Sequence, residues 1–172
     1  HHNYFLRRNF KEYAGKIFKN QIKLDKPYYY VNIQSMHNPD YAPPGKESVF
    51  ILCPVPDLRY KADWSDDQEI ADSIIDDMSQ RIGFDFRKHT ETRVVLSPEK
   101  WQNMFGLYRG SGLGLAHDLN QVGGFRPKNK DEKFNNLYYV GASTVPGTGL
   151  PMTVISSRLV TERILKDHGH LS

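Results

Sequence analysis

The segment that most constrains this chain is NLYYVGASTVPGTGLPMTVISSRLVTERI, at residues 136–164. Its apolar start, Leu137 to Val140, predicts a strand, and a stretch rich in Gly and Pro follows. Pro151 then begins an expected helix, because proline is favoured in the first turn. The apolar stripe of that helix consists of Ile155, Leu159, Val160 and Ile164. Such a unit normally holds a phosphate-bearing cofactor near the start of a chain, whereas here it comes at the end.

The turn between this strand and helix lets a ligand approach the backbone closely. Its small or flexible residues are Gly141, Ala142, Ser143, Gly147 and Gly149. We expect the amides of Met152 and Thr153 to be free and to point out of the helix start, together with the positive end of the helix dipole. The turn therefore favours an electron-rich ligand. A tight turn without any ligand fits these residues equally well.

The glycine spacing argues against a dinucleotide-binding fingerprint. That fingerprint needs Gly-x-Gly-x-x-Gly directly after a strand and an acidic residue about 20 positions later. Gly141 is followed by Gly147 and Gly149, which is the wrong spacing. The second cluster, GSGLG at residues 110–114, follows WQNMFGLYR, which does not have the character of a strand. Neither cluster is expected to bind a pyrophosphate.

The composition is that of a soluble globular protein of one-domain size. The chain has 172 residues, of which 25% are charged and 38% hydrophobic, and no apolar run approaches the roughly 18 residues that cross a bilayer. The net charge of +3 is small, and basic residues do not alternate with aromatic ones along one face, which argues against nucleic-acid binding. The single cysteine, Cys53, is expected to be a buried structural thiol in a reducing compartment.

The opening HHNYFLRRNF contains neither a signal peptide nor an initiator methionine, so we expect the chain to be a piece of a longer polypeptide. Residues 5–20 predict an amphipathic helix with a basic face. Its apolar positions are Phe10, Tyr13, Ala14, Ile17 and Phe18. We expect this helix to pack on a sheet, and the alternative is that it lies at a membrane surface.

Three further strands are expected from composition. Residues 27–34 and 48–55 are rich in aromatic and β-branched side chains, and the second segment is expected to be buried on both faces. Residues 89–97 predict the third strand. Residues 106–133 show no clear period and predict a long irregular connection, of the kind that is often functional.

Two helices are expected in the same part of the chain. Ser65 and Gln68 form a capping-box pattern, and the apolar positions that follow predict a helix that ends at Gly83. The sequence Ser97-Pro98-Glu99 predicts the start of a short helix, with a capping serine and a proline in its first turn.

The stretch FNNLYYVGASTVPGTGLPM resembles the C-terminal flavin-contacting signature of the bacterial and fungal phytoene desaturase family, the FAD-dependent carotenoid desaturases and their oxygenase relatives. Upstream segments resemble the same family in the same order and at similar spacing. They are HHNYF, APPGKESVFILCPVPDL, DWS, LSPEKWQNMFGLYRGSGLGL and QVGGFRPKN. The resemblance covers nearly the whole chain.

The resemblance implies a fold of the α/β class with α+β character, as a fragment of a two-domain FAD/NAD(P)-binding flavoprotein. Residues 1–120 would be the C-terminal portion of a sheet-based, carotenoid-binding substrate domain. Residues 121–172 would supply the closing strand and helix of a Rossmann-like FAD domain. The loop that holds the FAD phosphates would lie in an N-terminal part of the same polypeptide. We therefore expect the 172-residue chain alone to be inactive and to bind no FAD.

The resemblance also assigns residues to the cofactor. Gly141, Ala142 and Ser143 would lie along the ribityl chain of FAD. The helix start would face the pyrimidine edge of the flavin, where a helix N-terminus stabilises the negative charge of the reduced ring. The residues assigned there are Gly149, Leu150, Pro151, Met152 and Thr153. Many desaturases have a histidine where this chain has Val145, so a role of that histidine does not carry over.

No metal site and no catalytic acid or base is expected. The histidines in charged stretches are expected to be solvated surface residues; they are His89, His117, His168 and His170. Asp76 and Asp77 are adjacent on an expected helix and should face different ways, so they do not indicate a carboxylate pair.

The implied reaction is the desaturation of a hydrophobic polyene such as phytoene or diapophytoene. A hydride leaves an allylic carbon for the flavin, a neighbouring proton is lost, and conjugation extends by one double bond. One alternative is a related flavin-dependent carotenoid oxygenase or terpenoid oxidoreductase, and another is a truncated fragment without catalytic activity. Because the substrate is a hydrocarbon, the enzyme is expected in the cytoplasm with peripheral attachment to a membrane.

Overall fold

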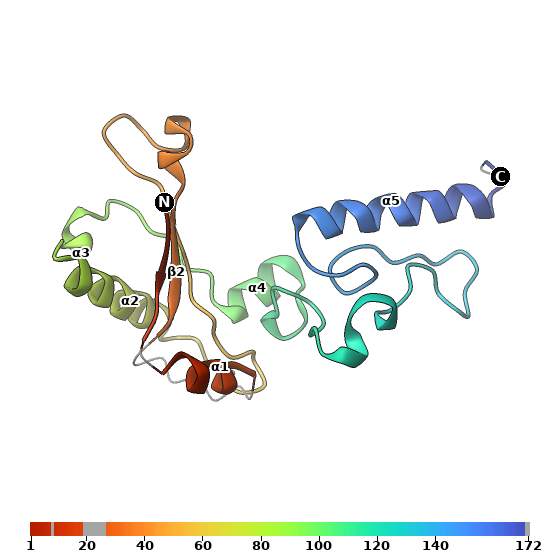
Figure 1. The fold of residues 1–172 in the computed structure, drawn as a ribbon, viewed down its shortest axis with the longest axis horizontal. Coiled ribbons are helices and arrows are strands. Elements are labelled where there is room, and N and C mark those ends of the chain that lie inside the picture. Colours follow the sequence, from red (N-terminus) through yellow and green to blue (C-terminus); the bar gives the residue numbers. More distant parts are fainter. Residues whose placement is uncertain (8, 19–26, 171–172) are drawn as a thin grey trace. The chain divides into compact units, whose positions relative to one another are not determined.

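The computed structural model of the chain describes residues 1–7, 9–18 and 27–170. The chain forms two compact units, His1–Gly110 and Ser111–Ser172 (Figure 1). The first contains an antiparallel sheet with helices, and the second contains irregular chain followed by a long helix. The expected mixture of helices and strands is confirmed. The assignment of residues 1–120 and 121–172 to two domains of a flavoprotein stays a prediction.

The sheet of the first unit has three strands, β1 (His2–Phe5), β2 (Tyr29–Ile33) and β3 (Val49–Leu52), in this order. Neighbouring strands are antiparallel, and Tyr30 stands opposite Tyr4 in β1 and Leu52 in β3. Side chains alternate between the two faces of a strand, which gives the sheet two different faces. The strand predicted over residues 27–34 is therefore confirmed as β2, the central strand.

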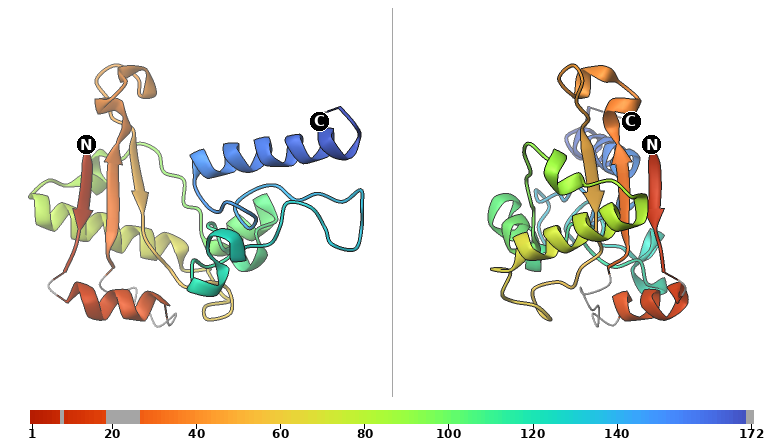
Figure 2. Two further views of the ribbon diagram at one scale, coloured as in Figure 1. Left: turned by 45° about the vertical axis from the view of Figure 1, so that its right-hand side comes forward. Right: turned by 90° about the vertical axis from the view of Figure 1, so that its left-hand side faces the viewer.

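Helix α2, Asp67–Ile82, lies along one face of the sheet (Figures 1 and 2). Its apolar residues recur at a four-residue spacing, which places them on one side of the helix. Ile74 and Met78 on that side pack with Tyr29 and Val31 of β2 into the core cluster of the unit. Burial of these four side chains contributes apolar stabilisation to the first unit.

Cys53 packs at the edge of this core, and its burial raises the pKa of the thiol to about 12. The thiol is therefore protonated at neutral pH and is a poor nucleophile. Cys53 is partly buried against the core, so the expectation of a buried structural thiol is confirmed in part.

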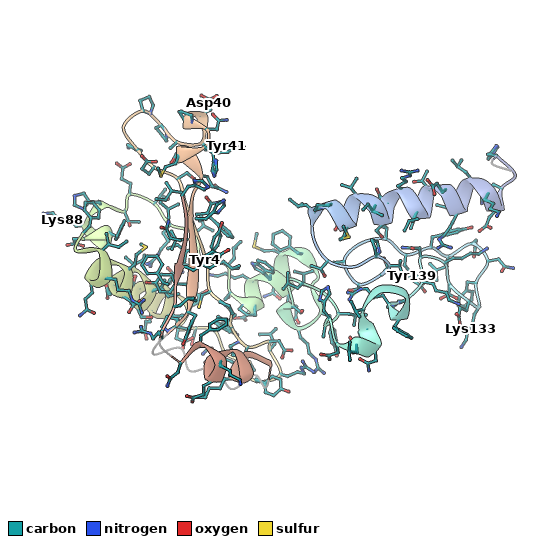
Figure 3. All side chains as sticks on the ribbon, viewed as in Figure 1. Tyr4, Asp40, Tyr41, Lys88, Lys133 and Tyr139 are labelled. Atoms are coloured by element: carbon teal, nitrogen blue, oxygen red, sulfur yellow. The ribbon has the colours of Figure 1, made fainter. Side chains whose placement is uncertain are left out.

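The other face of the sheet is exposed. Tyr4 on this face, labelled in Figure 3, is 71% exposed, and Phe50 and Leu52 are about half exposed. The expectation that residues 48–55 are buried on both faces is therefore wrong. Successive side chains of β3 point to opposite faces of the sheet. Helix α2 covers only one of these faces, so alternate side chains of β3 remain exposed.

Three shorter helices complete the described part of the first unit. They are α1 (Phe10–Phe18), α3 (Phe86–His89) and α4 (Pro98–Phe105). The Ser97 hydroxyl caps α4 by accepting a hydrogen bond from the Lys100 amide, as the sequence predicts. Lys100 also forms an ion pair of 2.6 Å with the buried Asp67 and lowers the pKa of that carboxyl group. This pair joins α4 to the start of α2.

Three local expectations for the first unit differ from the structure. The helix expected over residues 5–20 begins only at Phe10, because residues 2–5 pair with β2 as strand β1. Arg8 and residues 19–20 of that prediction lie outside the described residues. The N-cap of α2 is Asp66, so the capping box at Ser65 is wrong, although the helix and its end at Gly83 are confirmed.

The strand expected over residues 89–97 is also wrong. His89 ends α3, and among the described residues no strand pairs with the extended segment that follows. Arg93 of this segment instead donates hydrogen bonds to Gln68 and Asp72 on α2. Hydrogen bonds to α2 therefore hold this segment, in place of the strand pairing that its β-branched residues predicted.

The second unit is built on α5, Leu150–Asp167. The helix that Pro151 was expected to begin is confirmed. Its buried residues are Ser156 and Val160, whereas two members of the predicted stripe, Ile155 and Ile164, are more than a third exposed. Only part of the apolar stripe, including Val160, therefore packs against other described residues.

The chain before α5 is irregular, as residues 106–133 predict, and contains short 3₁₀ turns at Leu119–Gln121 and Gly123–Phe125. The prediction of a strand at Leu137 to Val140 is wrong. Among the described residues this segment forms only an isolated bridge, between Lys130 and Tyr138. No helix in the described residues combines the length and the apolar character that spanning a bilayer requires.

Asp77 joins α2 to the sheet and to the segment after β1. Its carboxylate accepts a hydrogen bond of 2.8 Å from the Tyr29 hydroxyl and forms ion pairs with Arg7 at 2.7 Å and Arg81 at 2.9 Å. Burial opposes ionisation, but these hydrogen bonds and charges together hold the pKa of Asp77 below its ordinary value. Asp77 is therefore an ionised group whose partners hold the unit together.

Replacing Asp77 by Asn should lower the free energy of unfolding by about 1–3 kcal/mol at pH 7, because Arg7 and Arg81 lose a partly buried counter-charge. The lowered pKa makes this stabilisation complete above the unfolded pKa near 4, and it is lost as the pH falls through the folded pKa. The difference between parent and variant should therefore shrink below about pH 4. Urea unfolding followed by tryptophan fluorescence measures it, since Trp64 and Trp101 both lie in the first unit.

Asp76→Asn is the matched control. Asp76 is adjacent in sequence but faces away from Asp77, as predicted, and pairs with Arg87 at an exposed position. Its replacement should change the free energy of unfolding by less than about 1 kcal/mol. Equal losses in the two variants would contradict the role assigned to Asp77.

Candidate functional site

The turn at residues 141–149 lies directly before α5 and leaves its backbone accessible. Gly141 and Gly149 have φ angles of 115° and 122°, which residues with a Cβ rarely adopt. A Cβ at either glycine would meet no atom within 4 Å. Ala142 is partly exposed and Ser143 is exposed. Flat groups of a ligand could therefore approach the main chain here.

The start of α5 is also accessible, with Leu150, Pro151 and Thr153 exposed and Met152 partly exposed. The expectation that the Thr153 amide is free is wrong, because it donates a hydrogen bond of 2.8 Å to the Gly149 carbonyl and so closes the first helical turn. Among the described residues the amides of Leu150 and Met152 have no partner, and proline has no N–H. Two amides and the positive end of the helix dipole thus remain for an electron-rich ligand.

A buried polar network supports the turn from below. Asn129 and Ser156 are fully buried, and Thr144 nearly so. The Asn129 Nδ2 lies 3.2 Å from the Thr144 hydroxyl, 3.3 Å from the Ser156 hydroxyl and 3.0 Å from the Val145 carbonyl. The Ser156 hydroxyl in turn accepts a hydrogen bond of 3.1 Å from the Gly141 amide. The network therefore fixes the start of the turn to the first half of α5.

Arg126 ties the preceding irregular segment to the same turn. Its guanidinium is buried and donates to the carbonyl of Ala142 at 2.7 Å and to that of Gln121 at 2.9 Å. It also donates to the carbonyls of Leu115 and Ala116, both at 3.2 Å. A single side chain thus satisfies main-chain acceptors from three places in the chain, which would otherwise be costly to bury.

The end of the second glycine cluster, Leu113 and Gly114, packs on this turn. A Cβ on Gly114, whose φ is 70°, would lie 2.6 Å from the Ser143 hydroxyl oxygen. Next to it, the Thr148 hydroxyl donates a hydrogen bond of 2.6 Å to the Leu113 carbonyl. The cluster was not expected to bind a pyrophosphate, and in the structure it allows close contact between two segments of the backbone.

The described residues of the site offer main-chain groups and no positioned acid or base. His117 lies against Gly147 but is exposed, and His89, His168 and His170 are exposed as the sequence predicts. Two carboxyl groups of the second unit have lowered pKa values, and their partners lie in the loop before α5. Hydrogen bonds from Tyr139 and from two backbone amides lower the pKa of Asp131, and those from Lys130 and Tyr138 lower that of Asp167, at the far end of α5.

Sequence reasoning missed Arg126 and Asn129, the two residues that hold the turn. Both lie in QVGGFRPKN, a segment that stands out by its family resemblance and not by its chemistry. A buried arginine in an irregular segment has no periodic signal. Only its setting between two glycine-rich stretches could have suggested that it satisfies main-chain carbonyls.

Comparison with known proteins finds several relatives that are desaturases by name. No family model matches the chain. Phytoene desaturase from Fusarium fujikuroi is 36% identical over 189 residues, which cover 98% of this chain and 33% of that protein. A zeta-carotene-forming phytoene desaturase from Myxococcus xanthus is 39% identical over 168 residues, which cover 96% of this chain and 32% of that protein.

A more distant relative is a 4,4'-diapophytoene desaturase from Methylomonas sp., which is 30% identical over 170 residues and matched over 98% of this chain and 33% of its own length. The chain thus spans about a third of the length of the curated relatives it matches. The matched region therefore includes nearly all residues of both units.

Replacing Ser156 by Ala should lower the free energy of unfolding by about 1–3 kcal/mol, because the Gly141 amide and Asn129 lose a buried partner. It should also speed hydrogen exchange at the Gly141 amide, which mass spectrometry of peptides from the turn can follow. Ser157→Ala is the matched control, since the Ser157 hydroxyl is exposed and bonds only to Val154 of its own helix. Indistinguishable behaviour of the two variants would refute the supporting role of Ser156.

Proposed function

We propose that this chain, a homologue of the phytoene and diapophytoene desaturases over nearly its whole length, is the C-terminal part of an FAD-dependent carotenoid desaturase. The observation that carries this proposal is the similarity across 96–98% of the chain to proteins named for phytoene or diapophytoene desaturation. The reaction would dehydrogenate a carotenoid precursor such as phytoene or diapophytoene. It would lengthen the conjugated system by one double bond in each step.

The residues of the second unit fit a flavin cofactor. Gly141, Ala142 and Ser143 present accessible backbone, which suits contact with the ribityl chain. The unpaired amides of Leu150 and Met152 suit the electron-rich pyrimidine edge of the ring. Gly149, Pro151 and Thr153 would shape this helix start. Bound FAD would supply the redox chemistry by accepting a hydride from an allylic carbon.

The protein would contribute binding, orientation and the exclusion of water. Main-chain groups held by Arg126 and Asn129 would fix the cofactor without further reorganisation. Val145, where many desaturases have a histidine, can neither donate nor accept a proton. The described residues of this site would therefore position the ligands, and a group outside them would remove the proton.

The exposed face of the sheet supports a hydrocarbon substrate. The large side chains on it are Tyr4, Tyr30, Phe50 and Leu52, and three of them are about half or more exposed. Covering this area with a polyene would remove apolar surface from water at about 25 cal/mol per Å². This supports the assignment of residues 1–120 to the substrate-binding domain.

A hydrocarbon substrate dissolves in the bilayer, so we include peripheral contact with the cytoplasmic face of a membrane in the proposal. Helix α1 exposes Phe10 and Lys11, an aromatic and a basic residue side by side. Binding to vesicles with anionic lipid should fall when Lys11 is replaced by Glu. Unchanged binding would remove α1 from the membrane contact.

A desaturase is favoured over a carotenoid oxygenase or another terpenoid oxidoreductase, because the relatives named above are all desaturases by name. The third hypothesis, a fragment without activity, applies to the 172-residue chain in isolation. The phosphates of FAD would be held by an N-terminal part of the same polypeptide. On that basis the chain alone should purify without flavin.

Product analysis tests the function. The complete polypeptide that contains this chain, expressed in a host that makes phytoene or diapophytoene, should yield products with additional conjugated double bonds and longer-wavelength absorption. About one FAD should be released per denatured polypeptide. New carbonyl groups on the products would instead establish an oxygenase, and unchanged precursor with no bound flavin would defeat both hypotheses.

Ala142→Leu is the site-directed arm of this experiment. The larger side chain would block the backbone of the turn, and bound FAD should fall about tenfold, the equivalent of about 1.4 kcal/mol. Ala116→Leu is the matched control, since Ala116 is exposed in the same unit and contributes only its carbonyl to Arg126. Equal FAD content in the two variants would remove Ala142 from the cofactor site.

A further inference from the structure

Three histidines gather at one end of the sheet in the first unit. His1 and His2 come from the start of β1, and His37 comes from the turn that follows β2. Each has a ring nitrogen within 4.8 Å of a ring nitrogen of the other two, and all three side chains are exposed. The ring centroid of His1 lies 4.2 Å from that of His2 and 3.9 Å from that of His37.

Backbone pairing brings these residues together. His2 stands opposite Asn32 in the antiparallel ladder, and the Ile33 amide donates a hydrogen bond of 3.1 Å to the His1 carbonyl. A single 3₁₀ turn, Gln34–Met36, then reverses the chain, and the His37 amide closes it by donating to the Gln34 carbonyl at 3.0 Å. The cluster therefore depends on the register of the sheet and not on chance contacts of long side chains.

One ring of the cluster is oriented by a neighbour. The Nδ1 of His2 lies 2.5 Å from the Tyr30 hydroxyl, on the adjacent strand. In the tautomer whose Nδ1–H donates to the Tyr30 hydroxyl oxygen, Nε2 of His2 keeps its lone pair for a ligand. Histidines that bind metals are commonly oriented in this way, by a hydrogen bond to the other ring nitrogen.

We propose that His1, His2 and His37 bind one divalent transition-metal ion, with Zn²⁺ as the ion to test, and that water completes the coordination. Three imidazole nitrogens suit Zn²⁺ and its first-row neighbours, whereas Ca²⁺ and Mg²⁺ prefer oxygen ligands. Zn²⁺ needs nitrogens about 2.0–2.1 Å from the ion, so small rotations of exposed rings would close the site. The site is independent of the flavin chemistry proposed above.

The sequence by itself predicts no metal site, and His37 is far from the other two histidines along the chain. The competing account is that three imidazole rings simply stack at an exposed sheet end, as ring contacts of this kind are mildly favourable without any ion. The two accounts differ in whether removal of one ring changes metal affinity more than removal of an unrelated exposed histidine does.

The test is Zn²⁺ titration of the 172-residue chain in competition with a chromophoric chelator. The N-terminal amine is acetylated, because a free amine beside His1 would bind metal by itself. We expect one Zn²⁺ per chain and weaker binding in acid, since protons compete for the imidazoles. His37→Gln should weaken binding about tenfold or more, and Tyr30→Phe, which keeps all three imidazoles, should weaken it by up to about tenfold.

His168→Gln is the control, since it removes one exposed imidazole from the second unit. It should leave the affinity unchanged. Equal affinity in the parent, His37→Gln and His168→Gln overturns the proposal, and so does an equal loss in both variants, which would indicate independent surface histidines. Far-UV circular dichroism accompanies each titration, and a loss of affinity counts in favour only where the spectrum matches that of the parent.

Discussion

A buried guanidinium is the interaction on which the second unit depends. Arg126 donates to carbonyls of Leu115, Ala116, Gln121 and Ala142, which belong to an irregular segment and to the glycine-rich turn. Neither segment forms a ladder that would satisfy these acceptors, and unsatisfied buried carbonyls destabilise a fold. One charged side chain therefore provides the hydrogen bonds that a strand ladder would otherwise provide. Asn129 and Ser156 form further buried hydrogen bonds beneath the turn.

The two units are stabilised by different physical effects. In the first, α2 and the sheet bury an apolar cluster, and Asp77 fastens the same elements through a hydroxyl and two guanidinium groups. In the second, few side chains are buried and those that are include Asn129, Thr144 and Ser156. A polar interior of this kind has narrow geometric requirements, so it suits a turn that must hold one shape.

These features are consistent with a binding site made from main chain. Small residues let a ligand reach the backbone of the turn, and the start of α5 leaves the amides of Leu150 and Met152 without partners among the described residues. Of the described side chains that could move protons, His117 lies beside Gly147 of the turn but is exposed. The ligand would therefore supply the chemical reactivity, and the polypeptide would supply the binding geometry and a fixed electrostatic field.

By itself the sequence determined the local elements that have a strong periodic or capping signal, namely α2, α4 and α5, and through the family resemblance it indicated the glycine-rich turn. It failed where pairing decides the outcome. Residues 2–5 became a strand, whereas residues 89–97 and 137–140 did not, because a strand exists only where a partner lies alongside. Only the tertiary structure brought Arg126 to four carbonyls and His37 to His1 and His2. Such contacts join positions far apart in sequence, and no local pattern encodes them.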